Sequence, residues 1–583
     1  MKEIIKQLIL DSLKEEASFV VEHPADISKG DYSTNVALVL AKKLKQNPVD
    51  FAHSLVVEIQ KNLPDTISKV EVAGPGFINF FLSPKFFAES LKEILKTDEE
   101  FGKKPLQESD VWAIEYGSPN PNKSMHLGHM RNVITGVTLC NLIEWGGGKV
   151  VREMVDNNRG IAIAKLMWGY LVCGEKDAGR VEDILYWQSH KNEWHTPESS
   201  GKKPDRLMDE MYVKGASECE KPEIDKKVRE MVVKWEEKDP VIWELWATVL
   251  DFAHQGQNET LKRLGARFDY VWHEHEHYEE GKRYVKEGLE KGIFKKLEDG
   301  AILTNLESYG LSDTIVQKND GTALYITQDI ALTDLKKKKH NAHHQVWVIG
   351  PEQSLALEQL FAVCEQLGIG KREEFLHVSY GYVSIKGQGK MSSRAGNVVY
   401  ADDFFDEVKT KVEEIMKERI VGEEKGSIAE KIAHGAVVYE MLKAGRTKDI
   451  SFDIEKALSF EGDSGPYLQY AHTRAISVLR KAKEEGIEMS GGVKIENSDS
   501  PLTKILYRFP EIVEEAFTLK APQLVVTYLT ELASSFNGYY ANTIIIDKAN
   551  LQESSTRLAV VSAFATVMKN GLTILGIPVP EKM

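Results

Sequence analysis

The chain contains 583 residues, of which 42% are hydrophobic and 28% are charged, and its formal net charge is −15. These proportions are typical of soluble globular proteins and exclude a disordered or a membrane chain. A chain of this length predicts about three to five domains. No apolar run reaches the roughly 18 residues of a membrane-spanning helix, so we expect no membrane association.

Residues 1–105 are predicted to form a small α/β domain. The segment opens with an amphipathic helix that carries acidic residues, unlike a signal or transit peptide. Residues 70–72 and 77–81 are typical of strands on either side of a Gly-Pro-Gly turn. The four cysteines of the chain are scattered singly, which predicts a reducing, cytoplasmic compartment without disulfides.

The next segment predicts a nucleotide-binding βαβ unit. Residues 111–114 indicate a strand, a loop follows, and a helical pattern runs from about residue 128 to the glycines at 146–148. Residues 149–155 then indicate a second strand. Because such a unit presents the free N–H groups of a helix N-terminus to the loop, we expect an anion-binding site there.

His126 and His129 stand three residues apart where this helix begins, so both can face one ligand. Gly128 lies between them, and its missing side chain would let an adenine or ribose approach the backbone. The alternative is a zinc half-site or an ordinary surface, but no cysteine or third ligand is spaced to complete a metal site.

Residues 165–290 predict a polar, largely helical insertion into this fold. Near its end, residues 273–277 read His-Glu-His-Glu-His, which would suit a metal only if a strand aligned these side chains. The fold is expected to resume with parallel strands at 346–349 and 375–380. The cationic run at 336–340 suits either a solvated helix end or a phosphate contact.

A glycine-rich loop at residues 387–396 contains a Lys-Met-Ser-Ser sequence. By itself this composition predicts a mobile surface hairpin. The same mobility would let its lysine close over a triphosphate and neutralise the charge that develops as pyrophosphate leaves. The motif consists of Lys390, Met391, Ser392 and Ser393.

The pairing of HxGH with KMSS resembles the class I aminoacyl-tRNA synthetases, and the surrounding residues are similar to the arginyl family along nearly the whole chain. The resemblance implies a multidomain α/β fold with a Rossmann-like catalytic domain. It assigns residues 1–105 to a tRNA-contacting α/β domain, 106–404 to the catalytic domain, 405–459 to a helical connection and 460–583 to an all-α anticodon-binding bundle. Near the start of that bundle, the side chains that suit either core packing or base stacking are Tyr467, Tyr470, His472 and Arg474.

The resemblance also implies a reaction. ATP would activate L-arginine to arginyl-adenylate, and the arginyl group would pass to the 3′ end of tRNA(Arg), which must bind first. Mg²⁺ would accompany ATP, and no protein-bound metal is expected. We expect a cytoplasmic monomer, although a net charge of −15 offers no support for an RNA partner. The positions matching the ATP site are His126, Gly128, His129, Lys390, Met391, Ser392 and Ser393.

A guanidinium has five N–H donors in a fixed plane and therefore needs planar acceptors. Asp329, helped by Tyr325, is expected to bind the guanidinium because the two match the family pattern. By sequence alone they better suit an ordinary amphipathic helix with a solvated acid. Asn120, Gln353 and Glu115 would hold the α-amino and carboxylate end. The positions that match the arginine contacts of the family are Glu115, Ser118, Asn120, Tyr325, Asp329 and Gln353.

The catalytic candidates are His126, His129, Lys123 and Lys390. Many arginyl enzymes lack the loop lysine and use one upstream of HxGH; this chain has both, and its sequence does not decide between them. The alternatives are another HxGH nucleotidyltransferase, an inactive paralogue, or a cysteinyl or lysyl synthetase. Another nucleotidyltransferase would not need the helical C-terminal region, and an inactive paralogue would have lost motif residues. A cysteinyl synthetase would need clustered thiolates, and a lysyl synthetase would fit planar acceptors less well.

Overall fold

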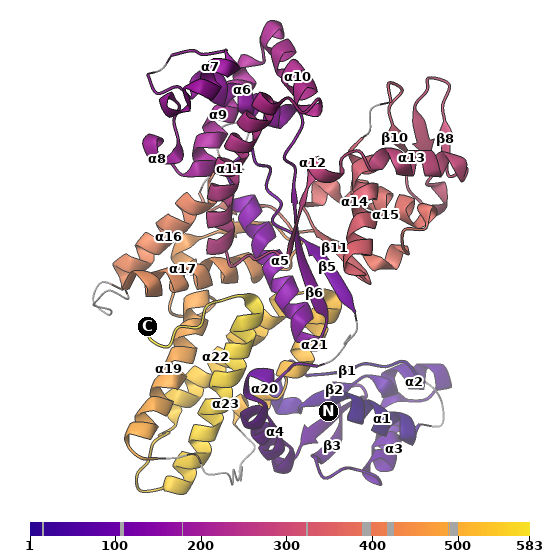
Figure 1. Cartoon of the computed structure of the whole chain (residues 1–583). Coiled ribbons are helices and arrows are strands. Elements are labelled where there is room, and N and C mark those ends of the chain that lie inside the picture. The colour runs from indigo at the N-terminus through magenta and orange to yellow at the C-terminus, as the bar shows by residue number, and fades with distance from the viewer. Residues whose placement is uncertain are drawn as a thin grey trace.

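The computed structural model describes residues 1–13, 17–104, 110–177, 179–321, 324–387, 398–416, 425–487, 489 and 500–583. Figure 1 shows a parallel sheet at the centre of the molecule. A helical insertion rises above the sheet, and a smaller lobe projects to one side. The N-terminal domain and the C-terminal helices lie together below it.

The N-terminal domain is a four-stranded sheet with the order β1-β2-β4-β3. β3 (Ile67–Ala73) and β4 (Phe77–Leu82) pair antiparallel around a turn in which Gly74 and Gly76 have positive φ. These are the two strands that the sequence predicts. The remaining elements are β1 (Val21–Glu22), β2 (Tyr32–Thr34), α1 (Lys2–Ser12), α2 (Val36–Leu44), α3 (Pro48–Gln60) and α4 (Pro84–Thr97).

The central sheet has five parallel strands in the order β12-β11-β5-β6-β7. α5 (Leu127–Trp145) connects β5 to β6 and buries its apolar side chains in the main core, as expected. β7 lies within the span 165–290, which the sequence predicts to be largely helical. The strand is too short to show a clear two-residue period in the sequence. The strands are β5 (Val111–Glu115), β6 (Lys149–Asp156), β7 (Tyr270–His273), β11 (His344–Val348) and β12 (Phe375–Val378).

The helical insertion joins β6 to β7 and has a core of its own, rich in Trp and Met. Its helices α6 and α9 cross with their backbones in contact at two glycines. A Cβ on Gly169 would lie 1.9 Å from the Met211 oxygen, and one on Gly215 would lie 2.0 Å from the Lys165 oxygen. The helices are α6 (Ile161–Cys173), α7 (Ile184–Ser189), α8 (Pro197–Ser200), α9 (Pro204–Glu218), α10 (Pro222–Glu236) and α11 (Pro240–Arg263).

The smaller lobe follows β7 and holds a three-stranded antiparallel sheet with the order β10-β9-β8. Its helices α14 and α15 also cover the edge of the central sheet that β11 and β12 form (Figure 1). The elements are α12 (Glu274–His277), α13 (Gly281–Glu290), β8 (Phe294–Lys296), β9 (Ile302–Thr304), β10 (Thr314–Gln317), α14 (Tyr325–His340) and α15 (Ser354–Leu367).

The C-terminal part is helical, apart from β13 (Val383–Ile385), which pairs in parallel with β14 (Ile450–Phe452). His472 packs in the core, whereas Arg474 lies over the rings of Tyr470 and Tyr540. The helices are α16 (Ala401–Ile415), α17 (Lys425–Leu442), α18 (Ile454–Ala457), α19 (Gly465–Glu484), α20 (Pro501–Leu506), α21 (Phe509–Leu519), α22 (Gln523–Asn542) and α23 (Leu551–Leu575).

Among the described residues, α23 is the one helix long and apolar enough to cross a membrane, and 83% of its most apolar window is buried inside the fold. The expectation that no segment reaches this length is therefore wrong for α23. Figure 1 shows α23 beside α19 and α22, where it forms the core of the helical bundle.

Candidate active site

The start of α5 holds two imidazoles in a defined tautomer. His126 Nδ1 accepts a hydrogen bond from the Gly128 N–H at 3.1 Å, and His129 Nδ1 accepts one from the His126 N–H at 3.1 Å. The two ring centroids lie 3.9 Å apart. Because each Nδ1 accepts a backbone proton, each neutral ring carries its own proton on Nε2 and can donate it to a ligand.

Burial keeps both rings neutral. Burial and the charge of Lys123 lower the pKa of His126, and burial, His126 and Lys123 together lower the pKa of His129 to about 3. The site therefore offers neutral N–H donors rather than cations at pH 7. Gly128 serves this arrangement directly, because a Cβ there would lie 2.9 Å from Cε1 of His126.

The backbone at this helix start is not an open anion site. The Leu127 N–H donates to the Val399 oxygen at 3.2 Å. The N–H groups of Gly128 and His129 are both engaged by the His126 side chain. The expectation of free amides is therefore wrong, since the His126 imidazole and the carbonyl oxygen of Val399 accept their hydrogen bonds. Phosphate oxygens must be bound largely by side chains.

The segment that follows the KMSS loop lies against the same helix start. His126 forms an antiparallel bridge with Tyr400, and the Ala401 N–H donates to the Met125 oxygen at 2.9 Å. Lys390, Met391, Ser392 and Ser393 lie outside the described residues. The described chain that follows their loop reaches the HxGH motif at Val399, Tyr400 and Ala401.

Lys123 projects into solvent beside the imidazoles. Its loop is held to α11 by Gln257, whose Nε2 donates to the carbonyl oxygens of Asn120 at 3.0 Å and Lys123 at 2.9 Å. The charge of Lys123 acts on the pKa of both imidazoles and of Asp209. This lysine therefore stands where a polyphosphate beside the imidazoles would need a counter-charge.

Glu115 ends β5 and is not a free acceptor. Lys336 Nζ lies 2.6 Å from Glu115 Oε2 and 3.8 Å from Glu153 Oε2, and the lysine is 1% exposed. Burial acts to lower the pKa of Lys336, but the two carboxylates raise it above its ordinary value. Lys336 is thus neither a solvated helix end nor a phosphate contact. It neutralises the carboxylate that was expected to contact substrate directly.

Asp329 lies two turns before Lys336 on α14, and the two charges share one helical face. Burial and the negative charge of Glu115 raise the pKa of Asp329 to about 7. The residue nevertheless keeps solvent-exposed surface. Within the described part of the chain, no ion pair engages Asp329. It is an available acceptor for a cation.

The other predicted arginine contacts lie near carboxyl ends of the same strands. Ser118 Oγ accepts from the Val155 N–H at 3.0 Å, and the exposed Asn120 accepts from Asn157 Nδ2 at 3.3 Å. Gln353 is exposed on the turn after β11. Tyr325 begins α14 but is 85% exposed, so its ring does not enclose Asp329 in this structure. Ligands of parallel sheets bind at this edge.

Asp156 organises the histidines near the end of β7. Its carboxylate lies 2.7 Å from His273 Nδ1 and 3.0 Å from His254 Nε2. Burial acts to raise the pKa of Asp156, but these hydrogen bonds lower it to about 2. Residue 273 ends β7 and residues 274–277 form α12, so the alternating histidines do not share a strand face. The described residues contain no group arranged to hold a metal ion.

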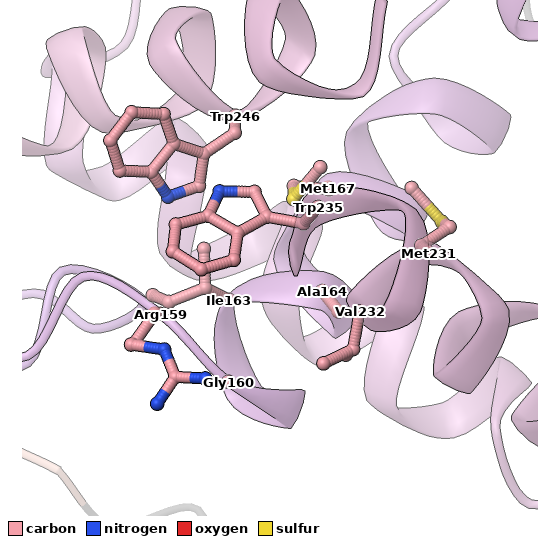
Figure 2. Close-up of a pocket in the computed structure, with 9 residues that line it drawn as sticks. All are labelled: Arg159, Gly160, Ile163, Ala164, Met167, Met231, Val232, Trp235 and Trp246. Atoms are coloured by element: carbon pink, nitrogen blue, oxygen red, sulfur yellow. The ribbon is translucent and has the colours of Figure 1, made fainter. Parts of the chain in front are cut away.

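A small apolar pocket lies inside the helical insertion, with Trp235 and Trp246 along one wall and Arg159 at its edge (Figure 2). The Arg159 guanidinium lies 3.9 Å from the centroid of Tyr278 and forms an ion pair with Glu236 at 2.8 Å. Because its lining is mainly the core of the insertion, the pocket contributes to packing rather than to the polar site on the sheet edge.

Sequence reasoning missed Glu153 and Lys336. Glu153 follows Arg152 in the middle of β6, and a charged residue in the interior of a parallel sheet is a signal of a buried partner. Lys336 has no such signal, because it opens a run of four lysines and differs from its neighbours only in its helical register with Asp329.

This arrangement is that of a class I aminoacyl-tRNA synthetase: a parallel sheet whose first strand leads to an HxGH helix, bridged to the chain that leaves a KMSS loop. The family model described as tRNA synthetases class I (R), catalytic domain, matches residues 90–167 and 184–454. Residues 1–82 match the arginyl tRNA synthetase N terminal domain, and 468–583 match the DALR anticodon binding domain. The chain belongs to the arginyl-tRNA synthetase family.

Individual relatives agree with this assignment. The chain is 34% identical to an arginine–tRNA ligase of Treponema denticola, with 97% of this chain and 94% of the relative covered. It is 32% identical to that of Bacteroides thetaiotaomicron, with 95% of each covered. The solved arginyl-tRNA synthetase of Thermus thermophilus matches all of both chains with a TM-score of 0.80 at 23% identity, which shows a common fold.

Proposed function

We propose that this chain activates L-arginine with ATP and transfers it to the 3′ end of tRNA(Arg), at the carboxyl edge of the parallel sheet. The observation that carries this proposal is the unpaired Asp329 carboxylate on the edge that also holds the two imidazoles. A guanidinium is the cation whose planar fork best suits a carboxylate acceptor.

Asp329 would bind the guanidinium, and Tyr325 would close over it when arginine enters. Asn120, Ser118 and Gln353 would hold the α-amino and carboxylate end, since they lie at neighbouring strand ends. Glu115 would shape the site from behind, through its pair with Lys336.

In the first step, a carboxylate oxygen of arginine attacks the α-phosphorus in line and forms a C–O–P bond. The bond from that phosphorus to the bridging oxygen breaks, and pyrophosphate leaves with the electron pair. His126 and His129 donate their Nε2 protons in hydrogen bonds to the phosphate oxygens as charge develops. Lys123 and Lys390 balance the charge of the pyrophosphate, and Mg²⁺ arrives with ATP.

In the second step, the 2′-hydroxyl of the terminal adenosine attacks the carbonyl carbon of the adenylate, and AMP leaves. Residues 1–105 and 460–583 would hold the tRNA, the latter at its anticodon, as the name of the matching C-terminal domain suggests. Residues 106–404 would carry the chemistry and 405–459 would connect the two regions. We propose that the protein works as a cytoplasmic monomer.

Pyrophosphate exchange with each amino acid in turn, with and without tRNA, tests the activity. We expect exchange with arginine alone, and only when tRNA is present. Exchange with arginine that ignores tRNA would contradict the proposed order of binding. Absence of exchange with every amino acid would contradict the activity itself.

The two lysines are distinguished by comparing Lys123→Ala with Lys390→Ala in the same assay. We expect Lys123→Ala to raise the KM for ATP, because the charge of Lys123 already reaches both imidazoles. A normal KM for ATP in Lys123→Ala, together with a raised KM in Lys390→Ala, would show that the loop lysine is the one that binds the triphosphate.

A further inference from the structure

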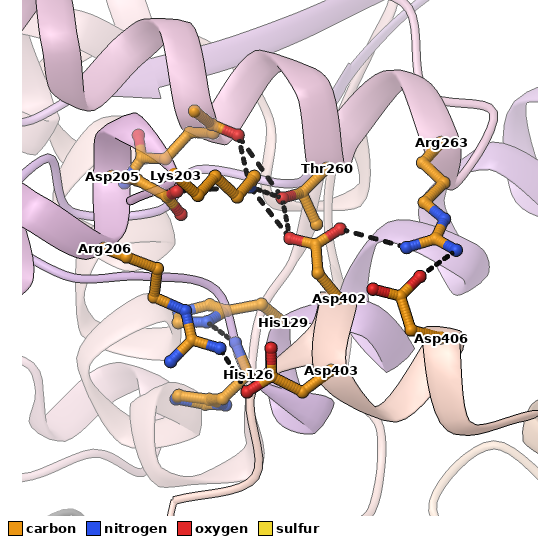
Figure 3. A network of polar contacts seen from close by, with 12 residues as sticks. His126, His129, Lys203, Asp205, Arg206, Thr260, Arg263, Asp402, Asp403 and Asp406 are labelled. Atoms are coloured by element: carbon orange, nitrogen blue, oxygen red, sulfur yellow. Dashed lines mark hydrogen bonds and ion pairs between the residues drawn. The ribbon is translucent and has the colours of Figure 1, made fainter. Parts of the chain in front are cut away.

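Side chains of the helical insertion bind the first turn of α16, near the two imidazoles (Figure 3). Lys203 Nζ, which precedes α9, lies 2.8 Å from Asp402 Oδ2 and 2.7 Å from the Gly256 oxygen. Thr260 Oγ1 donates to the same Asp402 oxygen at 2.6 Å. These contacts fix the start of α9 against the helix that follows the KMSS loop.

Arg206, in the first turn of α9, has a different environment. Its guanidinium carbon lies 3.1 Å from the centroid of the Tyr400 ring, and its Nη2 lies 2.5 Å from Asp403 Oδ2. Tyr400 is the residue that bridges to His126. The guanidinium therefore stacks on the residue whose backbone bridges to the first imidazole of HxGH, and Figure 3 shows its ion pair with Asp403.

The ion pair of Arg206 is one that a ligand can replace. The Asp403 side chain is 68% exposed, whereas Asp402, the partner of Lys203, is 19% exposed. An exposed pair is weak because water screens it, so Arg206 can leave Asp403 at little cost. The stack on Tyr400 does not depend on that carboxylate and would keep the guanidinium in place.

A triphosphate at this site needs side-chain cations, because the amides at the start of α5 are occupied and both imidazoles are neutral. Arg206 and Lys123 both act on Asp209, whose Oδ2 accepts a hydrogen bond from the Tyr400 hydroxyl at 3.1 Å. Burial raises the pKa of Asp209, and both cations act to lower it. The charges of Arg206 and Lys123 thus both act on one carboxylate, and that of Lys123 also acts on the imidazoles.

We propose that Arg206 contacts the β- and γ-phosphates of ATP and stabilises the pyrophosphate as it leaves. On ATP binding, the guanidinium exchanges the Asp403 carboxylate for phosphate oxygens, which its planar fork can bind in pairs. The helical insertion would thereby supply a phosphate ligand to the catalytic domain. This proposal rests on the activity proposed above.

Calorimetric titration with a non-hydrolysable ATP analogue, together with arginine-dependent pyrophosphate exchange, tests the proposal in the full-length chain. We expect Arg206→Ala to weaken analogue binding and raise the KM for ATP and the inhibition constant of pyrophosphate, each about 10- to 100-fold. Arg206→Lys should recover part of this loss, while the KM for arginine stays within about threefold in both variants. Arg229→Ala, on α10, removes an exposed ion pair with Asp225 and is the matched control.

Asp403→Asn separates a phosphate contact from a structural ion pair. If Arg206 binds phosphate, Asp403→Asn frees the guanidinium and analogue binding stays equal or becomes tighter. If Arg206 only anchors α16, Asp403→Asn weakens binding as much as Arg206→Ala does, which would overturn the proposal. Analogue binding by Arg206→Ala equal to that of Arg229→Ala would also overturn it. Because analogue binding needs no turnover, these results are independent of whether the arginine activity itself is found.

Discussion

At the scale of single residues, the protonation of Asp329 couples arginine binding to pH. Its pKa in the free protein is raised to about 7. Below that pH the carboxyl is protonated and loses its attraction for a guanidinium, so affinity for arginine should fall as pH drops below 7 and level off above it. A bound guanidinium favours the carboxylate, so binding at pH 7 should release about half a proton.

Calorimetry of arginine binding in buffers with different ionisation enthalpies measures that proton. Asp329→Asn should abolish the release and weaken arginine binding by about 2–5 kcal/mol, because a buried cation then lacks its partner. ATP affinity should change much less. Proton release that persists in Asp329→Asn would assign the titration to another group, and an equal loss for ATP would make Asp329 structural.

The second prediction at this scale concerns the neutral imidazoles. His129→Ala removes an Nε2 donor that serves the transition state, so we expect kcat for exchange to fall about 10²- to 10³-fold with little change in either KM. Because the pKa of His129 is about 3, wild-type kcat should show no ionisation of this ring near pH 6.5. A large rise in the KM for ATP with normal kcat would instead indicate ground-state binding.

At the scale of elements, the glycine crossing of α6 and α9 sets the position of the insertion. Gly215→Ala would place a Cβ 2.0 Å from the Lys165 oxygen and force the helices apart. We expect a loss of about 1–3 kcal/mol in the local stability of the insertion. Hydrogen exchange of the α6 amides measures it without assuming that the whole chain unfolds as one unit.

The matched control is Gly538→Ala in α22, where a Cβ would meet nothing within 4 Å. This variant should be neutral or gain about 0.5–1 kcal/mol, because alanine favours the helix over glycine. Unchanged α6 exchange in Gly215→Ala would show that the two helices can separate without cost. The position of Arg206 on α9 would then depend on its contacts with α16 alone.

At the scale of the whole molecule, one carboxylate of the C-terminal helical bundle contacts the N-terminal domain. Glu511, on α21, accepts a hydrogen bond from the Tyr32 hydroxyl at 2.7 Å and lies 3.2 Å from His23 Nε2. Burial acts to raise the pKa of Glu511, but His23 and Tyr32 lower it to about 2. The ordinary value of about 4.5 in the unfolded chain makes this interaction stabilising at neutral pH.

We expect Glu511→Gln to destabilise the contact between the N-terminal domain and the helical bundle by about 2–3 kcal/mol above pH 5. Since the folded pKa is depressed, the difference from wild type should shrink as pH falls from about 4.5 towards 2. Limited proteolysis of the N-terminal domain against pH measures it. Glu514→Gln, which loses an exposed pair with Lys104, is the control, and equal sensitivity of both variants would contradict the prediction.

Much of this architecture could be predicted because its signals are local. The strands at 111–115, 149–156, 344–348 and 375–378 are short segments rich in β-branched and aromatic residues, and α5 has a clear helical period and a glycine end. β7 has only four residues, and its identity as a strand depends on pairing with β6. Local composition does not contain that information.

Local order along the chain was sufficient to indicate the fold class and the two motifs, and the arginine contacts it suggests stay predictions. It did not specify which charges are already neutralised. Lys336 forms an ion pair with Glu115, 221 residues away in the sequence, and the carbonyl oxygen of Val399 accepts a hydrogen bond from the Leu127 N–H. Pairing and desolvation depend on which distant side chains the fold brings together. The tertiary structure alone therefore decides that the imidazoles are neutral, that no ion pair of the described residues engages Asp329, and that Arg206 stacks on Tyr400.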